Sequence, residues 1–227
     1  MRPHDLVPPF SRAEQRIAIS DRVWYIPTRN DTPLDGFTFS GWNHPDLFGN
    51  DNPVVVEYCS GNGDWIAGKA LENPSLNWVA VEKKFDRVRK IWAKIKNLQL
   101  KNLIVICGEA YRTTSLFFAD ESIFDVYINF PDPWPKYRHT KNRIISDPFS
   151  KELWRILKKE SALTFVTDDP SFSTWGISVI QGHGGFVSLY PEPFFTTDEG
   201  GYGDSYFERL WRAKGKIIRY HRFIKKV

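Results

Sequence analysis

Short apolar runs that alternate with helix-like segments constrain the fold of this chain more than any other feature. Each run is rich in Val, Ile or Leu and has the length of a buried strand. The runs that we expect to be strands are 54–58, 78–82, 103–107, 123–128 and 163–166. The segments between them that we expect to be helices are 65–72, 85–96, 149–157 and 170–180. This alternation predicts an α/β fold, a mostly parallel, doubly wound sheet with helices on both faces.

The rest of the chain is less regular. Two further stretches near the end, 186–190 and 216–223, have β-like patterns. Residues 1–52 are rich in Pro, Asn and Asp and show little periodicity, so we interpret them as an N-terminal extension. We expect residues 53–227 to form one domain. In segment 85–96 we interpret Lys90 and Lys94 as part of a solvated helix face.

Composition narrows the class of partner. The net charge is +4, the pI is about 9.0, and the positive charge is clustered, which favours a polyanionic partner. The two cysteines, Cys59 and Cys107, have no spacing typical of a zinc site or a disulfide framework, so we expect no metal. The N-terminal residues do not resemble a signal peptide, and no apolar run is long enough to span a membrane. We therefore expect a cytoplasmic protein.

A proline-rich loop follows the expected strand 123–128. Residues 129–143 read Asn-Phe-Pro-Asp-Pro-Trp-Pro-Lys-Tyr-Arg-His-Thr-Lys-Asn-Arg. Prolines remove backbone donors and fix φ, so they end the strand and hold Asp132 stiffly at the carboxyl edge of the sheet. In open α/β sheets, ligands bind at that edge. A solvated turn is the common alternative for such a segment, but the dense basic run behind Asp132 favours a phosphate-binding loop.

Acidic residues follow successive expected strands. Glu57 closes the first, Glu82 closes the second, and Glu109 comes just after the third. Between the first strand and its helix lies a turn with Gly61 and Gly63, but a third glycine, required for a dinucleotide fingerprint, is absent. Three acids around this turn repel a pyrophosphate and suit a cationic nucleoside such as S-adenosylmethionine. Glu82 is placed to accept hydrogen bonds from ribose hydroxyls.

On these motifs the chain resembles the single-subunit bacterial tRNA (guanine-N7-)-methyltransferases, from about residue 54 to the C-terminus. The resemblance implies a Rossmann-like class I methyltransferase fold, S-adenosylmethionine as cofactor, tRNA as substrate, and no obligate protein partner. It also implies methylation of a guanine in the variable loop, at position 46 of the tRNA. The cofactor-binding positions that we expect are Glu57, Gly61, Gly63, Glu82, Glu109 and Asp132.

The expected substrate site draws on both lines of inference. From their charge, we expect four cations of the basic run to bind phosphates: Lys136, Arg138, Lys141 and Arg143. From the resemblance, Lys136 and Asp168 contact the substrate, and so does a late element that reads Ser205, Tyr206, Phe207 and Glu208. The chain departs from the family pattern at four positions: Cys59 for glycine, Glu109 for aspartate, Ser205 for threonine, and Asn142 within the basic run.

Guanine N7 carries an available lone pair, so no proton must leave before it attacks. Placement therefore matters more than a strong base. The resemblance implies that Asp132 is the catalytic acid, and its charge is suited to stabilise the cation that forms on the base. Asp168 is a second candidate, for the guanine N1–H and amino group. Trp134 fits either a stacking platform for the base or the core, and His139 fits a phosphate contact.

Three alternatives belong to other classes. Methyltransferases that act on an exocyclic amine of nucleic acid or protein have an Asn/Asp-Pro-Pro-aromatic loop at this point. Here the loop reads Pro-Asp-Pro-Trp, which argues against that class. A non-catalytic RNA-binding module needs no acids around a glycine turn. An NAD-dependent oxidoreductase is disfavoured because the third glycine is absent.

Overall fold

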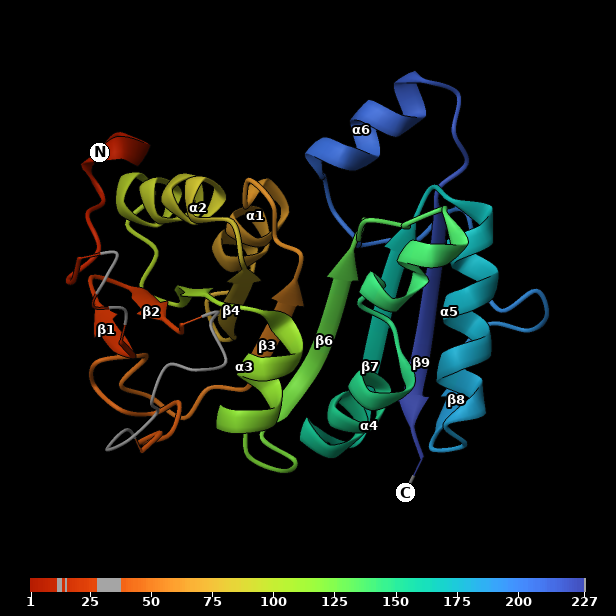
Figure 1. Ribbon diagram of the computed structural model, residues 1–227, viewed down its shortest axis with the longest axis horizontal. Coiled ribbons are helices and arrows are strands. Elements are labelled where there is room, and N and C mark those ends of the chain that lie inside the picture. The colour runs from red at the N-terminus through yellow and green to blue at the C-terminus, as the bar shows by residue number, and fades with distance from the viewer. Residues whose placement is uncertain (12–13, 15, 28–37, 227) are drawn as a thin grey trace. The chain divides into compact units, whose positions relative to one another are not determined.

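The computed structural model describes residues 1–11, 14, 16–27 and 38–226 (Figure 1). The chain divides into two compact units, Met1–Phe117 and Phe118–Val227. Among the described residues, no helix combines the length and the apolar character needed to cross a membrane.

The first unit is built on a largely parallel sheet. Its strands are β1 (Ala18–Ser20), β2 (Val23–Tyr25), β3 (Val54–Tyr58), β4 (Asn77–Glu82) and β5 (Leu103–Cys107). They lie in the order β1-β2-β5-β4-β3, and only β1 runs antiparallel to its neighbour. The helices are η1 (Pro3–Asp5), α1 (Asp64–Glu72), α2 (Phe85–Asn97) and α3 (Ala110–Phe117). All residues of β3 and β4 are buried, as expected for strands covered on both faces.

The N-terminal segment contributes to this sheet. Strand β2 pairs with β5, and the ring of Trp24 on β2 stacks on Phe39 at 5.1 Å. Trp42 meets both rings edge-on, at 6.3 Å from Trp24 and 4.9 Å from Phe39. These aromatic contacts bury part of the segment before residue 53. The boundary at residue 52 stays a prediction.

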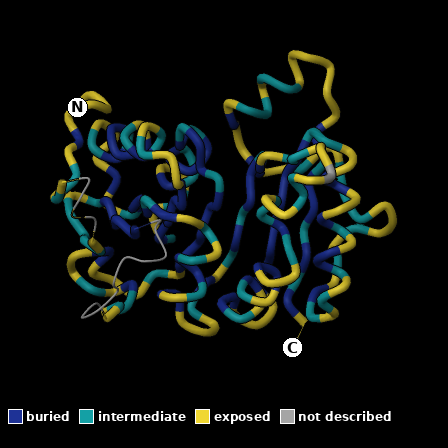
Figure 2. Tube along the Cα trace, in the orientation of Figure 1, coloured by how far each residue is buried: buried dark blue, intermediate teal, exposed yellow. Residues whose placement is uncertain are grey.

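The second unit has a mixed sheet with helices. Its strands are β6 (Ile123–Asn129), β7 (Leu157–Thr167), β8 (Phe186–Ser188) and β9 (Arg219–Lys225), in the order β6-β7-β9-β8. Strands β6 and β7 are parallel, and β9 is antiparallel to both β7 and β8. The helices are η3 (Tyr137–Asn142), α4 (Asp147–Ile156), α5 (Pro170–Gly182) and α6 (Tyr206–Ala213). Figure 2 shows that β7 and β9 form the buried centre of this unit.

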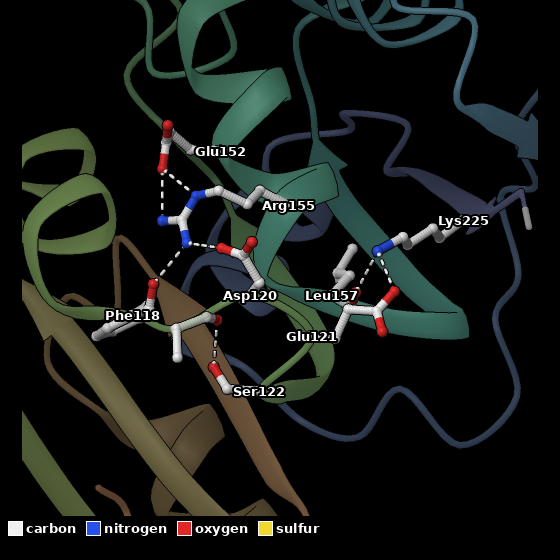
Figure 3. A network of polar contacts seen from close by, with 9 residues as sticks. Phe118, Asp120, Glu121, Ser122, Glu152, Arg155, Leu157 and Lys225 are labelled. Carbon is white, nitrogen blue, oxygen red and sulfur yellow. Dashed lines mark hydrogen bonds and ion pairs between the residues drawn. The ribbon is translucent and has the colours of Figure 1, made fainter. Parts of the chain in front are cut away.

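A polar network fixes the start of the second unit (Figure 3). The Arg155 guanidinium on α4 donates to the Phe118 carbonyl at 2.7 Å and to Asp120 at 2.6 Å. Lys225 on β9 is 3% exposed and donates to the Leu157 carbonyl at 2.7 Å and to Glu121 at 3.3 Å. Both cations thus fasten the segment that leads into β6. At its far end, β6 leads into the proline-rich loop.

Candidate functional site

In the first unit the glycine turn is joined to the acid that ends β4. The Gly61 N–H donates to Glu82 Oε2 at 3.1 Å, and the Lys84 N–H donates to Oε1 at 2.8 Å. Glu82 is buried, at 4% exposure, and Arg87 lies 3.7 Å from Oε2. The sequence did not predict these two backbone hydrogen bonds, which orient both carboxylate oxygens, and the expected contact of Glu82 with a ribose stays a prediction.

The turn itself has a left-handed backbone at three positions. The φ angles are +63° at Cys59, +55° at Gly61 and +75° at Gly63. A Cβ at Gly63 would lie 2.7 Å from Ile91 Cγ1, so only glycine fits there. Cys59 adopts the same left-handed conformation although its side chain makes it cost about 1–2 kcal/mol. Replacement of glycine by Cys59 therefore adds strain without removing the left-handed turn.

The two other acids lie at the same edge of the first sheet. Strand β4 pairs with β3 on one side and β5 on the other, so the ends of all three strands are neighbours. Glu57 in β3 is 2% exposed. Glu109 is exposed, and its carboxylate accepts the N–H groups of Tyr111 (3.1 Å) and Arg112 (2.7 Å) at the start of α3. Glu109 therefore caps a helix, and its expected contact with a cofactor stays a prediction.

Two lysines of α2 contact the turn. Lys90 is exposed, as expected for a solvated helix face, whereas Lys94 is half-buried. Lys94 Nζ donates to the Asn62 carbonyl at 2.9 Å and lies 3.4 Å from Asp64. Lys90 Nζ donates to Asn62 Oδ1 at 3.2 Å. The spacing of the lysines along the helix could not predict their contacts with Asn62. These contacts depend on where α2 packs relative to a turn that is distant in sequence.

In the second unit the proline-rich loop presents Asp132 to solvent. Pro131 is buried and Asp132 is exposed. Phe130 and Trp134, two residues to either side of Asp132, both have φ +45°, and neither is glycine. Such backbone costs on the order of 1–3 kcal/mol per residue and is concentrated at functional sites. The Phe130 N–H donates to the Val166 carbonyl at 2.9 Å, so β7 holds the near side of the loop.

Arg143 holds the far side of the loop. Its Nε donates to the Pro133 carbonyl at 2.9 Å, and its guanidinium lies 5.0 Å from the ring centroid of Trp175 and 5.8 Å from that of Phe172. This support was not expected from the sequence, where Arg143 belonged to the phosphate-binding run. Its contact with phosphate stays a prediction, as do those of the exposed cations Lys136, Arg138 and Lys141.

Trp134 and His139 of the proline-rich loop lie against each other. Trp134 is half-buried and meets the His139 ring edge-on, with the centroids 5.7 Å apart. Arg138 Nε donates to His139 Nε2 at 3.2 Å. Trp134 is therefore neither a core residue nor a fully exposed platform. One ring nitrogen of His139 already accepts a hydrogen bond.

Asp168 follows β7, the strand next to β6. It is half-buried, and burial raises the pKa of its carboxyl above the usual 3.8, while the charges of Lys216 and Arg219 oppose that shift. Its neighbour Asp169 caps α5 by accepting the Phe172 N–H at 2.8 Å. The parallel pairing of β6 with β7 thus places Asp168 at the same edge as the loop of Asp132.

The late element begins α6. Ser205 Oγ accepts the Glu208 N–H at 3.1 Å and caps the helix. Glu208 Oε1 accepts hydrogen bonds from Tyr220 Oη at 2.6 Å and Arg212 Nε at 3.0 Å. The Phe207 ring lies 6.2 Å from that of Phe130, beside the proline-rich loop. Tyr206 is 45% exposed. Ser205 and Glu208 therefore have structural roles, and their contacts with a substrate stay predictions.

Comparisons with known proteins agree with this arrangement. A family model described as "Putative methyltransferase" matches residues 51–218. A protein of Chlamydia abortus named tRNA (guanine-N(7)-)-methyltransferase is 42% identical over 227 residues, which cover 100% of this chain and 99% of that protein. A protein of the same name from Bacillus licheniformis is 30% identical over 172 residues, covering 76% of this chain and 80% of that protein.

Solved structures of low sequence identity share the fold. The 16S rRNA methyltransferase KamB is 16% identical with a TM-score of 0.58, covering 78% of this chain and 89% of that one. A SAM-dependent methyltransferase from Aquifex aeolicus is 14% identical with a TM-score of 0.53, covering 78% and 85%. The expected Rossmann-like class I methyltransferase fold is therefore confirmed. Because a relative matches over the full length at this identity, the chain belongs to the tRNA (guanine-N7-)-methyltransferase family.

Proposed function

We propose that this protein transfers a methyl group from S-adenosylmethionine to N7 of a guanine in tRNA, and that it does so without an obligate protein partner. The observation that carries the proposal is the buried Glu82 carboxylate bound to the N–H of Gly61. It lies at the sheet edge where β3 ends just after Glu57 and where Glu109 follows β5. The names of the full-length relatives support guanine N7 and tRNA.

The residues of the turn fit the methyl donor. Gly63 has no room for a Cβ because Ile91 packs against it, so glycine at this position fixes the shape of the turn. Glu82 has the acceptor oxygens that ribose hydroxyls require, and Glu57 suits the amino group of the donor. Gly61 allows close backbone approach. When bound, S-adenosylmethionine supplies the methyl group on a sulfonium.

Two acids of the second unit are suited to the acceptor base. Because guanine N7 attacks without losing a proton, the protein must orient the base and stabilise the positive charge that develops on it. We assign this charge stabilisation to Asp132, which the strained loop holds in place. We assign the guanine N1–H and amino group to Asp168. Burial raises the pKa of the Asp168 carboxyl, and in its ionised form the carboxylate can accept both hydrogen bonds.

The exposed cations Lys136, Arg138 and Lys141 then bind phosphates and position the RNA. They carry no base-specific information, so the choice of guanine rests on other contacts. By family membership we propose the variable loop as the target, at position 46.

The deciding experiment is nucleoside mass spectrometry of unmodified tRNA after incubation with the protein and S-adenosylmethionine. We expect 7-methylguanosine, absent when the donor is omitted, and digestion with mapping of the modified fragment places it in the variable loop. A methyl group on an exocyclic amine would overturn the proposal. Calorimetric titration with S-adenosylmethionine separates an enzyme from a non-catalytic RNA-binding module, which would bind no donor.

A further inference from the structure

Helix α6 contributes little to the packing of its own unit. None of its eight residues is buried, and Figure 2 shows the helix in intermediate and exposed colours. In Figure 1, α6 lies beyond the ends of β6 and β7 that carry the site loops. It is held by the hydrogen bonds of Glu208 and Arg212 with Tyr220, and by the ring contact between Phe207 and Phe130. A helix that covers no core is available for a partner.

The helix and the turn after it are strongly basic. Residues 205–219 contain one acidic residue, Glu208. The same segment contains five cationic residues: Arg209, Arg212, Lys214, Lys216 and Arg219. Two of them are engaged, because Arg209 pairs with Asp204 and Arg212 with Glu208. Lys214 and Lys216 are exposed, and the described part of the chain places no carboxylate within ion-pair distance of either. Lys214 Nζ lies 4.7 Å over the Trp211 ring.

The backbone keeps these two lysines at the surface. Gly215 stands between them with φ +71°, a left-handed conformation that ends α6 and turns the chain back toward β9. No heavy atom lies within 4 Å of the position of a Cβ on Gly215. The turn is therefore open on its outer side, where Lys214 and Lys216 flank it.

This basic segment lies next to the site loops of the same unit. The contact of Phe207 with Phe130 puts α6 beside the loop that carries Asp132. Lys216 and Arg219 are close enough to Asp168 for their charges to act on its carboxyl. An RNA whose guanosine lies at these acids has a continuous, negatively charged backbone, so its neighbouring phosphates pass near α6.

We propose that residues 205–219, the α6 surface, form a second contact for the RNA backbone, with Lys214 and Lys216 binding phosphates that flank the target guanosine. This inference rests on the proposed function and adds a binding surface separate from the basic run of η3. Charge complementarity identifies the partner as a polyanion, and proximity to Asp132 and Asp168 identifies it as the substrate RNA.

The test compares two double variants that remove the same charge. Lys214→Ala/Lys216→Ala removes the proposed contacts. Lys158→Ala/Lys159→Ala is the matched control, because these lysines are also exposed but lie at the opposite, amino end of β7. tRNA affinity is measured by fluorescence anisotropy over a range of salt concentrations. We expect the first variant to lower the slope of log affinity against log salt by about 1.4–1.8, from roughly 0.7–0.9 per phosphate contact. The control should keep the wild-type slope.

A charge-retaining variant and the affinity for S-adenosylmethionine distinguish a lost phosphate contact from a general loss of structure. Lys214→Arg/Lys216→Arg retains the charges and should restore the slope, and the donor affinity of all variants should equal that of the wild type. Equal salt slopes in the two alanine variants would overturn the proposal that the α6 surface binds RNA. Lys214 and Lys216 would then be solvated charges or a site for an acidic protein. If the wild type makes no 7-methylguanosine, the proposed function fails independently of this slope.

Discussion

At the scale of single residues, Gly63 is the position where the turn tolerates least change. An added Cβ would lie 2.7 Å from Ile91 Cγ1, and φ is +75°. Left-handed strain of about 1–2 kcal/mol and overpacking of about 1–3 kcal/mol both act against Gly63→Ala. We expect a loss of about 2–5 kcal/mol in the free energy of unfolding, measured by urea denaturation.

Gly68 provides a matched control for this prediction. It lies within α1, and a Cβ there would meet no heavy atom within 4 Å. Gly68→Ala should stabilise the protein by about 0.5–1 kcal/mol, because alanine is the better helix former. Equal effects of the two substitutions would contradict the steric account of the turn.

Asp132 combines exposure with a fixed backbone, which predicts a variant that folds but reacts slowly. Asp132→Asn keeps the shape and removes the charge that would stabilise the cationic base. We expect turnover to fall by about 10²–10³, the scale for one preorganised electrostatic contact. Single-turnover methyl transfer at saturating tRNA and donor measures the chemical step alone. A variant as fast as the wild type would exclude the electrostatic role.

Lys141 and Arg143 belong to one basic run but have different surroundings, so their substitutions should differ. Lys141 is exposed, and Lys141→Ala should lower the salt slope of tRNA binding by roughly one unit without loss of stability. Arg143 binds the Pro133 carbonyl and lies over Trp175, so Arg143→Ala should lower the unfolding free energy by about 1–3 kcal/mol.

Urea denaturation and salt-dependent anisotropy of both variants check this pair. If Arg143→Ala changed only the salt slope, then the guanidinium would serve the RNA and not the loop. If Lys141→Ala left the slope unchanged, then that lysine would be solvated surface.

At the scale of elements, β9 carries a buried histidine that makes stability depend on pH. His221 stacks on Phe165 at 3.8 Å, and Ser173 lies at hydrogen-bond distance of 2.8 Å. Burial, reinforced by the charge of Arg219, lowers the pKa of His221 to about 3 from its usual 6.5. Because the folded pKa lies below the unfolded one, the unfolded chain takes up the proton first as the pH falls.

The stability from neutral His221 is therefore complete above about pH 6.5 and is lost as the pH falls toward 3. The expected loss is about 1.4 kcal/mol per pH unit below pH 6.5. His221→Phe removes the titrating group, so the unfolding free energy of this variant should fall less steeply between pH 6.5 and 5. Parallel pH profiles of wild type and variant would show that the histidine does not titrate on unfolding.

The elements with a strong periodic pattern were predicted best from the sequence. Strands β3 and β5 have the expected bounds, and α2 differs by one residue at its end. Strand β7 begins earlier than expected, at Leu157, because the exposed residues Lys158, Lys159 and Glu160 interrupt its apolar pattern. Helix α3 was not expected, since its two adjacent threonines favour no helix, and it depends on the cap from Glu109.

At the scale of the whole molecule, each unit carries one part of the proposed reaction. The first has the glycine turn with the strand-end acids, and the second has the loop of Asp132, the end of β7 and the α6 surface. Apart from the α6 surface, the parallel strands place these residues at carboxyl ends, where the backbone leaves the sheet and side chains are available to a ligand. The parallel topology therefore explains why site residues that are far apart in sequence all lie at carboxyl ends of strands.

Local sequence patterns were enough to predict the alternation of strands and helices, the acids at strand ends and the stiff loop around Asp132. These features depend on local periodicity, on proline and on position relative to a strand end, all of which can be read from neighbouring residues. The side chains that support these features became known from the folded structure: Lys94 at the Asn62 carbonyl, Arg143 at Pro133, and Glu208 at Tyr220. Such contacts join separate elements, so they depend on how helices and strands pack, which no local pattern encodes.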